Sequence, residues 1–202
     1  RNLLEIFETR ATEMEEVLEP HAVLNKTRRC LIGAYFLNEY SFEASALFNP
    51  SIVRHPDQTG APDNGCRFIL SLRAVGEGHI SSLTFRSGTI SADGRVAVDP
   101  TARLASVPKV QSRAIGSNGD NVEVIFGPGD DISERVIFPI TDSQANGIED
   151  ARFVEFNEDA RKTFYATYTA YNGRAIRSEL LETTDFRSFR MKPLGGSAAR
   201  NK

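Results

Sequence analysis

The pair Asn172-Gly173, between strand-like residues 164–170 and 175–181, is the strongest short-range signal for a β-hairpin in this chain. Asp93-Gly94 is a second turn of this kind. Other short runs rich in β-branched and aromatic residues alternate with Gly, Asn and Asp, namely 68–73, 80–85, 122–126, 135–138 and 152–156. Strands this short indicate an all-β barrel, sandwich or propeller.

A weak internal repeat favours the propeller among these folds. Residues 67–94 and 163–186 each read as strand, turn, strand, and then a small hydroxyl residue two positions before an Asp. Self-similarity at such an interval is typical of propeller blades. The chain has strands for two to three blades, so it is either part of a propeller or a smaller sandwich. Residues 98–121, rich in Pro, Ser, Asn and Gly, are expected to form a surface loop.

The first 40 residues have a different pattern. Apolar residues recur at helical spacing from Leu3 to Leu18, and Pro20 follows them. A second helix is expected to begin after Asn25, which is a good N-cap residue. We therefore expect a helical extension over residues 1–40 and a β domain over residues 41–202.

Composition restricts the classes of function. The 202 residues carry a formal net charge of −3, so there is no basic footprint for nucleic acid. No apolar run has the length of a transmembrane helix, which predicts a chain without a membrane partner. Cys30 and Cys66 lack metal-ligand spacing and are expected to be buried thiols of a reducing, cytoplasmic compartment. Because the chain begins at Arg1 rather than Met, it is expected to be cut at the front.

An acidic pair, Glu149-Asp150, precedes the strand over residues 152–156, and an aromatic strand rich in Tyr and Thr returns after it. Side chains alternate faces along a strand, so Asp150 and Arg152 are expected to point the same way. A carboxylate and a guanidinium beside hydroxyl groups suit a polar ligand such as a sugar. The same residues are equally compatible with a strand-end ion pair on a solvated loop.

Two further segments carry candidate binding residues. Asn49 precedes Pro50, so its backbone is expected to be extended and its amide free to face a ligand, although a turn-forming Asn is the simpler interpretation. Residues 73–82 form a polar, Gly-containing loop from which Arg73, Glu77 and His79 could converge with Arg86 on an anion or a sugar. A structural, hydrogen-bonded histidine is the alternative for His79. The chain has no P-loop, zinc-ligand or nucleophile-elbow spacing.

Several motifs together resemble glycoside hydrolase family 130, the mannoside phosphorylases and related β-mannosidases. They span residues 39–202: Asn49-Pro50, Arg73-Ala74, 76–82, Glu149-Asp150-Ala151-Arg152, 165–171, 181–186 and Asn201-Lys202. The resemblance implies a five-bladed β-propeller, of which this chain holds the first two to three blades. It implies that Asp150 is the proton donor and that Arg73 and Lys202 serve a phosphate or sugar pocket. Ala151 departs from the family, which has Pro there.

The implied activity is cleavage of β-mannosidic bonds by inverting phosphorolysis, with release of mannose 1-phosphate. Inorganic phosphate is then a co-substrate, a mannose-containing oligosaccharide is the other substrate, and no cofactor is needed. Asn49, Arg73, His79, Arg86, Glu149, Arg152, Tyr168 and Lys202 are the expected binding residues. A β-mannosidase that uses water and a non-catalytic sugar-binding propeller remain alternatives. A fragment with missing blades is expected to be inactive and to expose a sheet edge, so it could form homo-oligomers.

Overall fold

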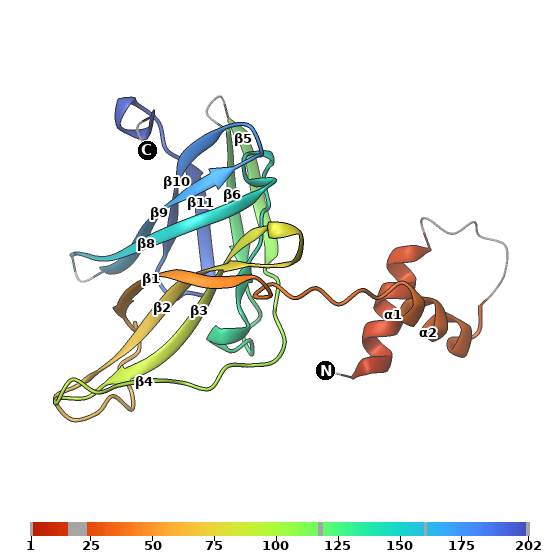
Figure 1. Ribbon diagram of the computed structural model, residues 1–202, viewed down its shortest axis with the longest axis horizontal. Coiled ribbons are helices and arrows are strands. Elements are labelled where there is room, and N and C mark those ends of the chain that lie inside the picture. The colour runs from red at the N-terminus through yellow and green to blue at the C-terminus, as the bar shows by residue number, and fades with distance from the viewer. Residues whose placement is uncertain (1, 16–23, 117–118, 160, 201–202) are drawn as a thin grey trace. The chain divides into compact units, whose positions relative to one another are not determined.

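A computed structural model describes residues 2–15, 24–116, 119–159 and 161–200 (Figure 1). The chain divides into two compact units, residues 1–40 and residues 41–202. The first is helical and the second is built from strands. Within the described ranges, no helix is long and apolar enough to cross a membrane.

Two helices, α1 (Leu3–Met14) and α2 (Lys26–Tyr35), make up the described part of the first unit. The expected N-cap at Asn25 is confirmed, because its side chain accepts a hydrogen bond from the Arg28 amide. The helices approach so closely that a Cβ on Gly33 would lie 1.8 Å from the Phe7 carbonyl oxygen. The expected end of the first helix at Pro20 lies outside the described residues.

Eleven strands are present in the described part of the second unit. They are β1 Ala46–Arg54, β2 Cys66–Val75, β3 Ser81–Ile90, β4 Val96–Val98, β5 Lys109–Gly116, β6 Gly119–Ile125, β7 Val136–Ile137, β8 Gly147–Glu158, β9 Arg161–Tyr171, β10 Ile176–Thr183 and β11 Ser188–Pro193. The Asn172-Gly173 hairpin is confirmed: Tyr171 pairs with Ile176, and Gly173 has a φ of 88°. The loop expected over residues 98–121 is wrong, because β5 and the start of β6 lie there.

The predicted propeller is wrong. The strands form one mixed sheet in the order β1-β2-β3-β8-β9-β10-β11-β6-β5, with β4 and β7 paired to β3, and this order does not close on itself. The repeated segments do form hairpins, β2–β3 and β9–β10. These hairpins belong to one continuous sheet and do not form separate blades. The pairing of β11 with β6, whose residues Met191 and Val122 lie far apart in sequence, is one such join.

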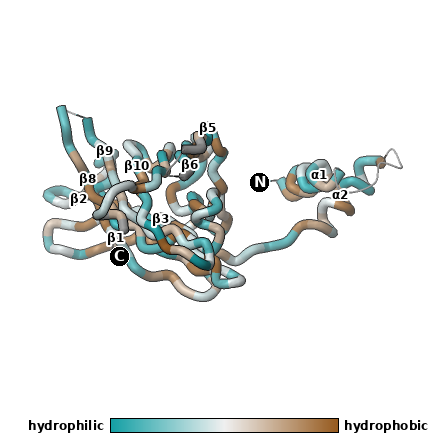
Figure 2. The backbone as a smooth tube through the Cα atoms, turned by 90° about the horizontal axis from the view of Figure 1, so that it is seen from above, coloured by the Kyte–Doolittle hydropathy of each residue, from teal (hydrophilic) through white to brown (hydrophobic). Residues whose placement is uncertain are grey.

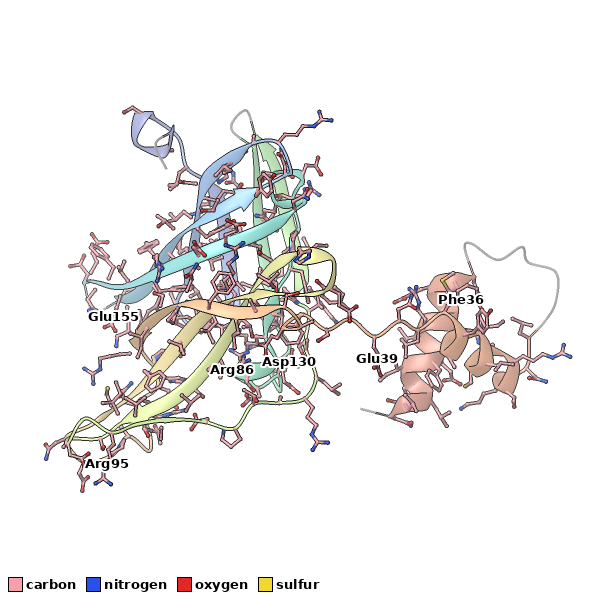
Figure 3. The ribbon with its side chains drawn as sticks, in the orientation of Figure 1. Phe36, Glu39, Arg86, Arg95, Asp130 and Glu155 are labelled. Atoms are coloured by element: carbon pink, nitrogen blue, oxygen red, sulfur yellow. The ribbon has the colours of Figure 1, made fainter. Side chains whose placement is uncertain are left out.

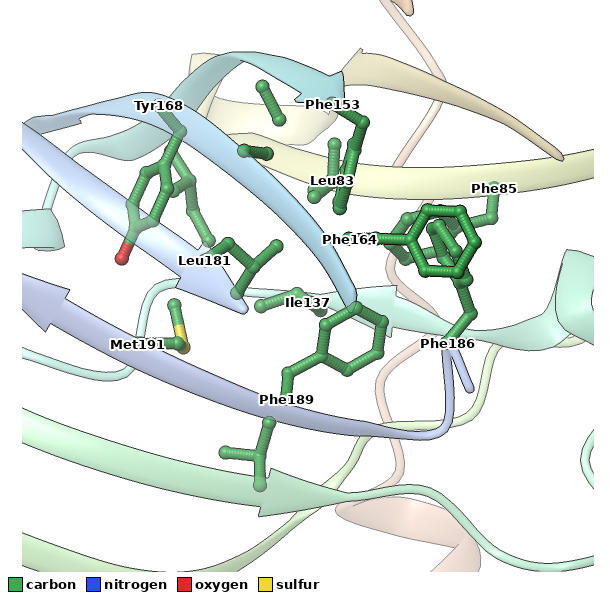
Figure 4. Packing of buried hydrophobic residues seen from close by; sticks show 14 of the residues in the cluster. Leu83, Phe85, Ile137, Phe153, Phe164, Tyr168, Leu181, Phe186, Phe189 and Met191 are labelled. Carbon is green, nitrogen blue, oxygen red and sulfur yellow. The ribbon is translucent and has the colours of Figure 1, made fainter. Parts of the chain in front are cut away.

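The core lies on the inner face of this sheet (Figure 4). Phe85 of β3 packs against Phe186 and Phe189, with ring centroids 5.9 and 5.6 Å away, and all three are at most 1% exposed. Hydrophobic and hydrophilic residues intermix along the strands, as a sheet with one buried face requires (Figure 2). Cys30 and Cys66 are free thiols, but they are half-buried and not buried as expected.

Candidate functional site

Strands β3 and β8 pair at one position, where Ser81 lies parallel to Gly147. Gly147 has a φ of 137°, and a Cβ there would lie 3.0 Å from the Ser81 Cβ. Glycine adopts this backbone conformation far more readily than other residues, and a Cβ here would require Ser81 to shift by a few tenths of an ångström. The junction therefore depends on Gly147, two residues before Glu149.

Two β-bulges face each other beside this junction. The register of β1 shifts between Phe48 and Ser51, and that of β8 shifts between Glu149 and Arg152. Each bulge contains a residue in the left-handed region, Asn49 with a φ of 53° and Asp150 with a φ of 55°. Bulges and left-handed non-glycine residues concentrate near functional sites, where they redirect a side chain. The extended backbone expected for Asn49 before Pro50 is thus wrong.

The bulges bring four of the sequence-predicted residues together, which we call the bulge cluster: Asn49, Arg73, Glu149 and Asp150. The Asn49 amide nitrogen Nδ2 donates to Asp150 Oδ1 at 2.6 Å. Arg73 donates from Nη2 to Glu149 Oε1 at 2.7 Å, and its Nη1 lies 3.5 Å from Asp150 Oδ1. Their charged side chains are 20% to 33% exposed, so solvent and a ligand can reach them.

Two residues that the sequence analysis missed hold Arg73 in place. Its Nε donates to the Ser81 hydroxyl at 3.0 Å, and its guanidinium lies 5.0 Å from the centroid of the Phe48 ring. The planar guanidinium thus stacks on an aromatic face while it bridges two carboxylates. Phe48 directly precedes Asn49, so an aromatic residue before the Asn-Pro pair was the available signal.

Asp150 and Arg152 were expected to point the same way, and this prediction is wrong. The bulge interrupts the alternation of side chains, and Arg152 Nη1 donates to the Pro50 carbonyl at 2.7 Å. In addition, the Phe153 amide donates to the Ser51 hydroxyl at 2.9 Å. These two hydrogen bonds connect β8 to the edge strand β1. Arg152 thus stabilises the packing of the two bulges and is not itself a member of the bulge cluster.

His79 lies in the loop between β2 and β3, in the short 3₁₀ helix Glu77–His79. It is exposed and has a φ of 61°. The loop leads directly into Ser81, which contacts Arg73, so His79 is close to the bulge cluster in sequence. Among the described residues, the His79 ring forms no hydrogen bond or ion pair with the bulge cluster.

Arg86, labelled in Figure 3, has its described hydrogen bonds and ion pair with residues outside the bulge cluster. Arg73 pairs with Leu83, and side chains alternate along a strand, so Arg86 projects from the opposite face of the sheet. There it is 7% exposed, forms an ion pair with Glu43, and donates to the Thr84 hydroxyl and the Phe85 carbonyl. These contacts hold the Arg86 side chain within the β unit. Lys202, the last of the expected binding residues, lies outside the described residues.

Tyr168 is also placed in the interior, at 2% exposure. Its hydroxyl donates to Glu179 Oε2 at 2.6 Å, and Gln144 Nε2 donates to the same oxygen at 2.9 Å. Burial, and then the charge of Glu179, raise the pKa of Tyr168 well above its ordinary value. Arg177 Nε, 3.1 Å from Glu179 Oε1, completes this buried polar network.

A separate open groove of about 160 Å³ lies over β6, β10 and β11. Arg190 pairs there with Glu123 and Glu182. Because these charges satisfy one another, we assign no ligand to this groove.

Comparison of the chain with protein-family models, with curated proteins and with solved structures finds no match. In the part of the chain that the structure describes, no three His, Cys, Asp or Glu side chains are grouped to hold a metal ion. The bulge cluster therefore has to be interpreted from its own chemistry. It offers carboxylate acceptors, an amide and a guanidinium within a few ångströms, which suits a ligand with several hydroxyl groups or an anion beside them.

Proposed function

We propose that the bulge cluster binds a carbohydrate and that the chain acts in the cleavage of β-mannosidic bonds by inverting phosphorolysis. One observation carries this proposal. Asn49, Arg73 and the Glu149-Asp150 pair come from three distant segments, yet they meet in one cluster through two left-handed bulge residues. They also belong to three of the motifs on which the resemblance to the mannoside phosphorylases rests. A strand-end ion pair alone would not need Asn49.

In this reaction Asp150 donates a proton to a sugar hydroxyl, which passes a proton to the glycosidic oxygen. A phosphate oxygen attacks the anomeric carbon from the opposite side, the bond to the glycosidic oxygen breaks, and mannose 1-phosphate forms with inverted configuration. Phosphate is already an anionic nucleophile, so the site needs one acid rather than an acid and a base. Arg73 would bind phosphate through its planar fork of donors.

A sugar-binding role without catalysis is the second candidate. In the ligand-free arrangement both the Asn49 amide and Arg73 direct donors at Asp150 Oδ1. Catalysis requires a sugar hydroxyl to reach Asp150 in place of one of these donors, whereas binding alone can leave both donors where they are.

The first test measures binding of β-1,2-, β-1,3- and β-1,4-linked mannobiose to this chain by NMR titration. We expect at least one disaccharide to bind, and we expect Asn49→Ala and Asp150→Ala to weaken binding about tenfold or more, in line with the loss of one to two charge-assisted hydrogen bonds. Asp142→Asn, which neutralises an exposed carboxylate elsewhere, is the control and should bind like the wild type. Absence of binding to all three would contradict both candidates.

The second test measures release of mannose 1-phosphate with and without phosphate. Asp150→Asn should keep binding but lower the rate by about 10²–10⁴-fold, the usual contribution of general acid catalysis. Free mannose released without phosphate would identify a hydrolase. Binding with no release of either product would support the non-catalytic candidate.

A further inference from the structure

An Asn side chain that precedes a glycine can react with the backbone nitrogen of that glycine and lose ammonia, which is called deamidation. Glycine favours this reaction because it has no Cβ to hinder the approach. Asn118 lies outside the described residues, so the structure distinguishes the other three pairs. The chain contains four such pairs: Asn64-Gly65, Asn118-Gly119, Asn146-Gly147 and Asn172-Gly173.

The Asn172-Gly173 pair lies in the turn between β9 and β10, and both residues are exposed to water. Asn172 Oδ1 accepts hydrogen bonds from the Arg174 amide at 2.9 Å and from the Ala175 amide at 2.8 Å. These donors polarise the side-chain carbonyl and stabilise the negative charge that develops on Oδ1 when a nucleophile attacks Cγ. Among the described residues, nothing accepts a hydrogen bond from the Gly173 amide, so water can remove its proton.

We propose that Asn172 is a site of spontaneous deamidation and that its own turn accelerates the reaction. A hydroxide ion takes the proton of the Gly173 amide, and the nitrogen attacks Asn172 Cγ while the two backbone donors hold Oδ1. The bond between Cγ and Nδ2 breaks, the leaving nitrogen takes a proton from water and departs as ammonia, and a cyclic imide remains. Water then opens the imide at either carbonyl, which leaves aspartate or isoaspartate and an added negative charge.

The Asn64-Gly65 pair lacks this assistance, although Asn64 is also exposed. The Gly65 amide donates to the Pro62 carbonyl at 2.9 Å, so the proton that must leave is held in a hydrogen bond. A Cβ on Gly65 would lie 2.3 Å from the Ile90 carbonyl oxygen, so the backbone here is closely packed. Within the described part of the chain, no hydrogen bond reaches the Asn64 side chain. We therefore expect Asn64 to react more slowly than Asn172.

The turn also packs on the strand that leads to the bulge cluster. The Asn146 amide donates to the Tyr171 carbonyl at 2.9 Å, and a Cβ on Gly173 would lie 2.8 Å from Asn146 Oδ1. Tyr171 pairs with Gly147, the glycine of the junction between β3 and β8. Isoaspartate in place of Asn172 lengthens the main chain beside this pairing, so that product should lower the unfolding temperature. This inference does not depend on the proposed function.

The test compares Asn172 with Asn64 in one sample of the whole chain, kept folded at mildly alkaline pH. Cleavage after Lys and Arg puts the four pairs in separate peptides, residues 55–67, 114–135, 136–152 and 163–174, so mass spectrometry follows each Asn by itself. Asn172 should deamidate about tenfold or more faster than Asn64, as expected for hydrogen bonds to a developing charge. In water that carries heavy oxygen, the product peptide should also gain the label, because water opens the imide.

The same incubation in urea is the matched control. An unfolded chain retains only fluctuating local structure, so the ratio of the two rates should fall to within about threefold of one. A ratio in the folded chain within about threefold of the ratio in urea overturns the proposal, because the turn then has no effect. Slower reaction of Asn172 than of Asn64 in the folded chain also overturns it and shows that the bonds to Oδ1 protect the side chain.

The variant Asn172→Asp carries the added charge without the longer main chain. The deamidated fraction of the wild type, separated by charge and checked by the same peptide analysis, should unfold at a lower temperature than this variant. Equal unfolding temperatures would overturn the expected effect of isoaspartate on the pairing of Tyr171 with Gly147.

Discussion

At the scale of single residues, Asn49 and Asp150 combine an unusual backbone conformation with a direct contact. Left-handed non-glycine residues cost of order 1–3 kcal/mol, less for Asn and Asp, whose short polar side chains tolerate this region. Two such residues, 101 positions apart, bond to each other at 2.6 Å. The arrangement directs both side chains to one point, which regular alternation along a strand would not allow.

The buried phenol of Tyr168 gives a residue-scale prediction about pH. Its pKa is raised in the folded state by burial and by Glu179, while in the unfolded chain it releases its proton near pH 10. Above pH 10 the unfolded state therefore binds fewer protons than the folded state, and stability falls as pH rises. We expect up to about 1.4 kcal/mol of this loss per pH unit to come from Tyr168.

Urea unfolding between pH 8 and pH 11 measures this loss. Tyr168→Phe should be less stable than the wild type at pH 8, because a hydrogen bond to Glu179 is removed, but it should have a shallower decline above pH 10. Tyr35→Phe, which removes an exposed phenol, is the control and should keep the wild-type slope. Equal slopes in Tyr168→Phe and the wild type would show that Tyr168 does not cause the decline.

At the scale of elements, the junction between β3 and β8 positions the bulge cluster. Ser81 pairs with Gly147 through the backbone and accepts a hydrogen bond from Arg73 through its side chain. One serine thus connects the strand pairing to the guanidinium that bridges Glu149 and Asp150. A substitution at this junction should therefore disturb the geometry of the bulge cluster, although it changes no charged side chain.

Gly147→Ala tests this connection. A Cβ at a φ of 137° is strained, and it would lie 3.0 Å from the Ser81 Cβ. We expect a loss of about 2–4 kcal/mol in unfolding free energy, since backbone strain and crowding add. Gly129→Ala is the matched control, because nothing lies within 4 Å of its Cβ and its φ is not in the left-handed region. A Gly147→Ala protein as stable as the control in urea unfolding would refute the role of the junction.

The sequence predicted strands better than it predicted their pairing. Period-2 patterns and the Asn172-Gly173 turn located the β9–β10 hairpin, because these signals are local. The join of β11 to β6 has no local signal, and assigning the hairpins to separate blades was therefore wrong. At the site, residue types identified Asn49, Arg73, Glu149 and Asp150, whereas the bulge that turns Arg152 away and the burial of Tyr168 depend on contacts across the sheet.

At the scale of the whole molecule, the β unit includes a segment that precedes its first strand. The Ser41 carbonyl accepts a hydrogen bond from the Glu77 amide, and the Ser45 amide donates to the Val75 carbonyl. Between them Glu43 pairs with the buried Arg86. Residues 41–45 thus belong to the β unit energetically, although they contain no strand.

Two truncations test this boundary. A chain that begins at Ser41 should keep the unfolding temperature of the β unit within about 2 °C, since changes of a few tenths of a kcal/mol shift it by no more than that. A chain that begins at Ala46 loses the partner of Arg86, and removing one member of a largely buried pair costs about 2–3 kcal/mol, or roughly 5–10 °C for a unit of this size. Scanning calorimetry measures both, and equal unfolding temperatures would contradict the assignment of residues 41–45.

The bulge cluster takes Asn49 from β1 and Arg73 from β2, and it takes Glu149 and Asp150 from β8, on the other side of the Ser81–Gly147 junction. A molecule that contacts all of them binds only while the two groups of strands are held together, so its binding is thermodynamically linked to the folding of the entire β unit. At a concentration of 100 times its dissociation constant, such a ligand adds about 2.7 kcal/mol to the unfolding free energy. A shift in melting temperature is therefore a direct way to search a library of sugars and anions for the natural ligand of this chain.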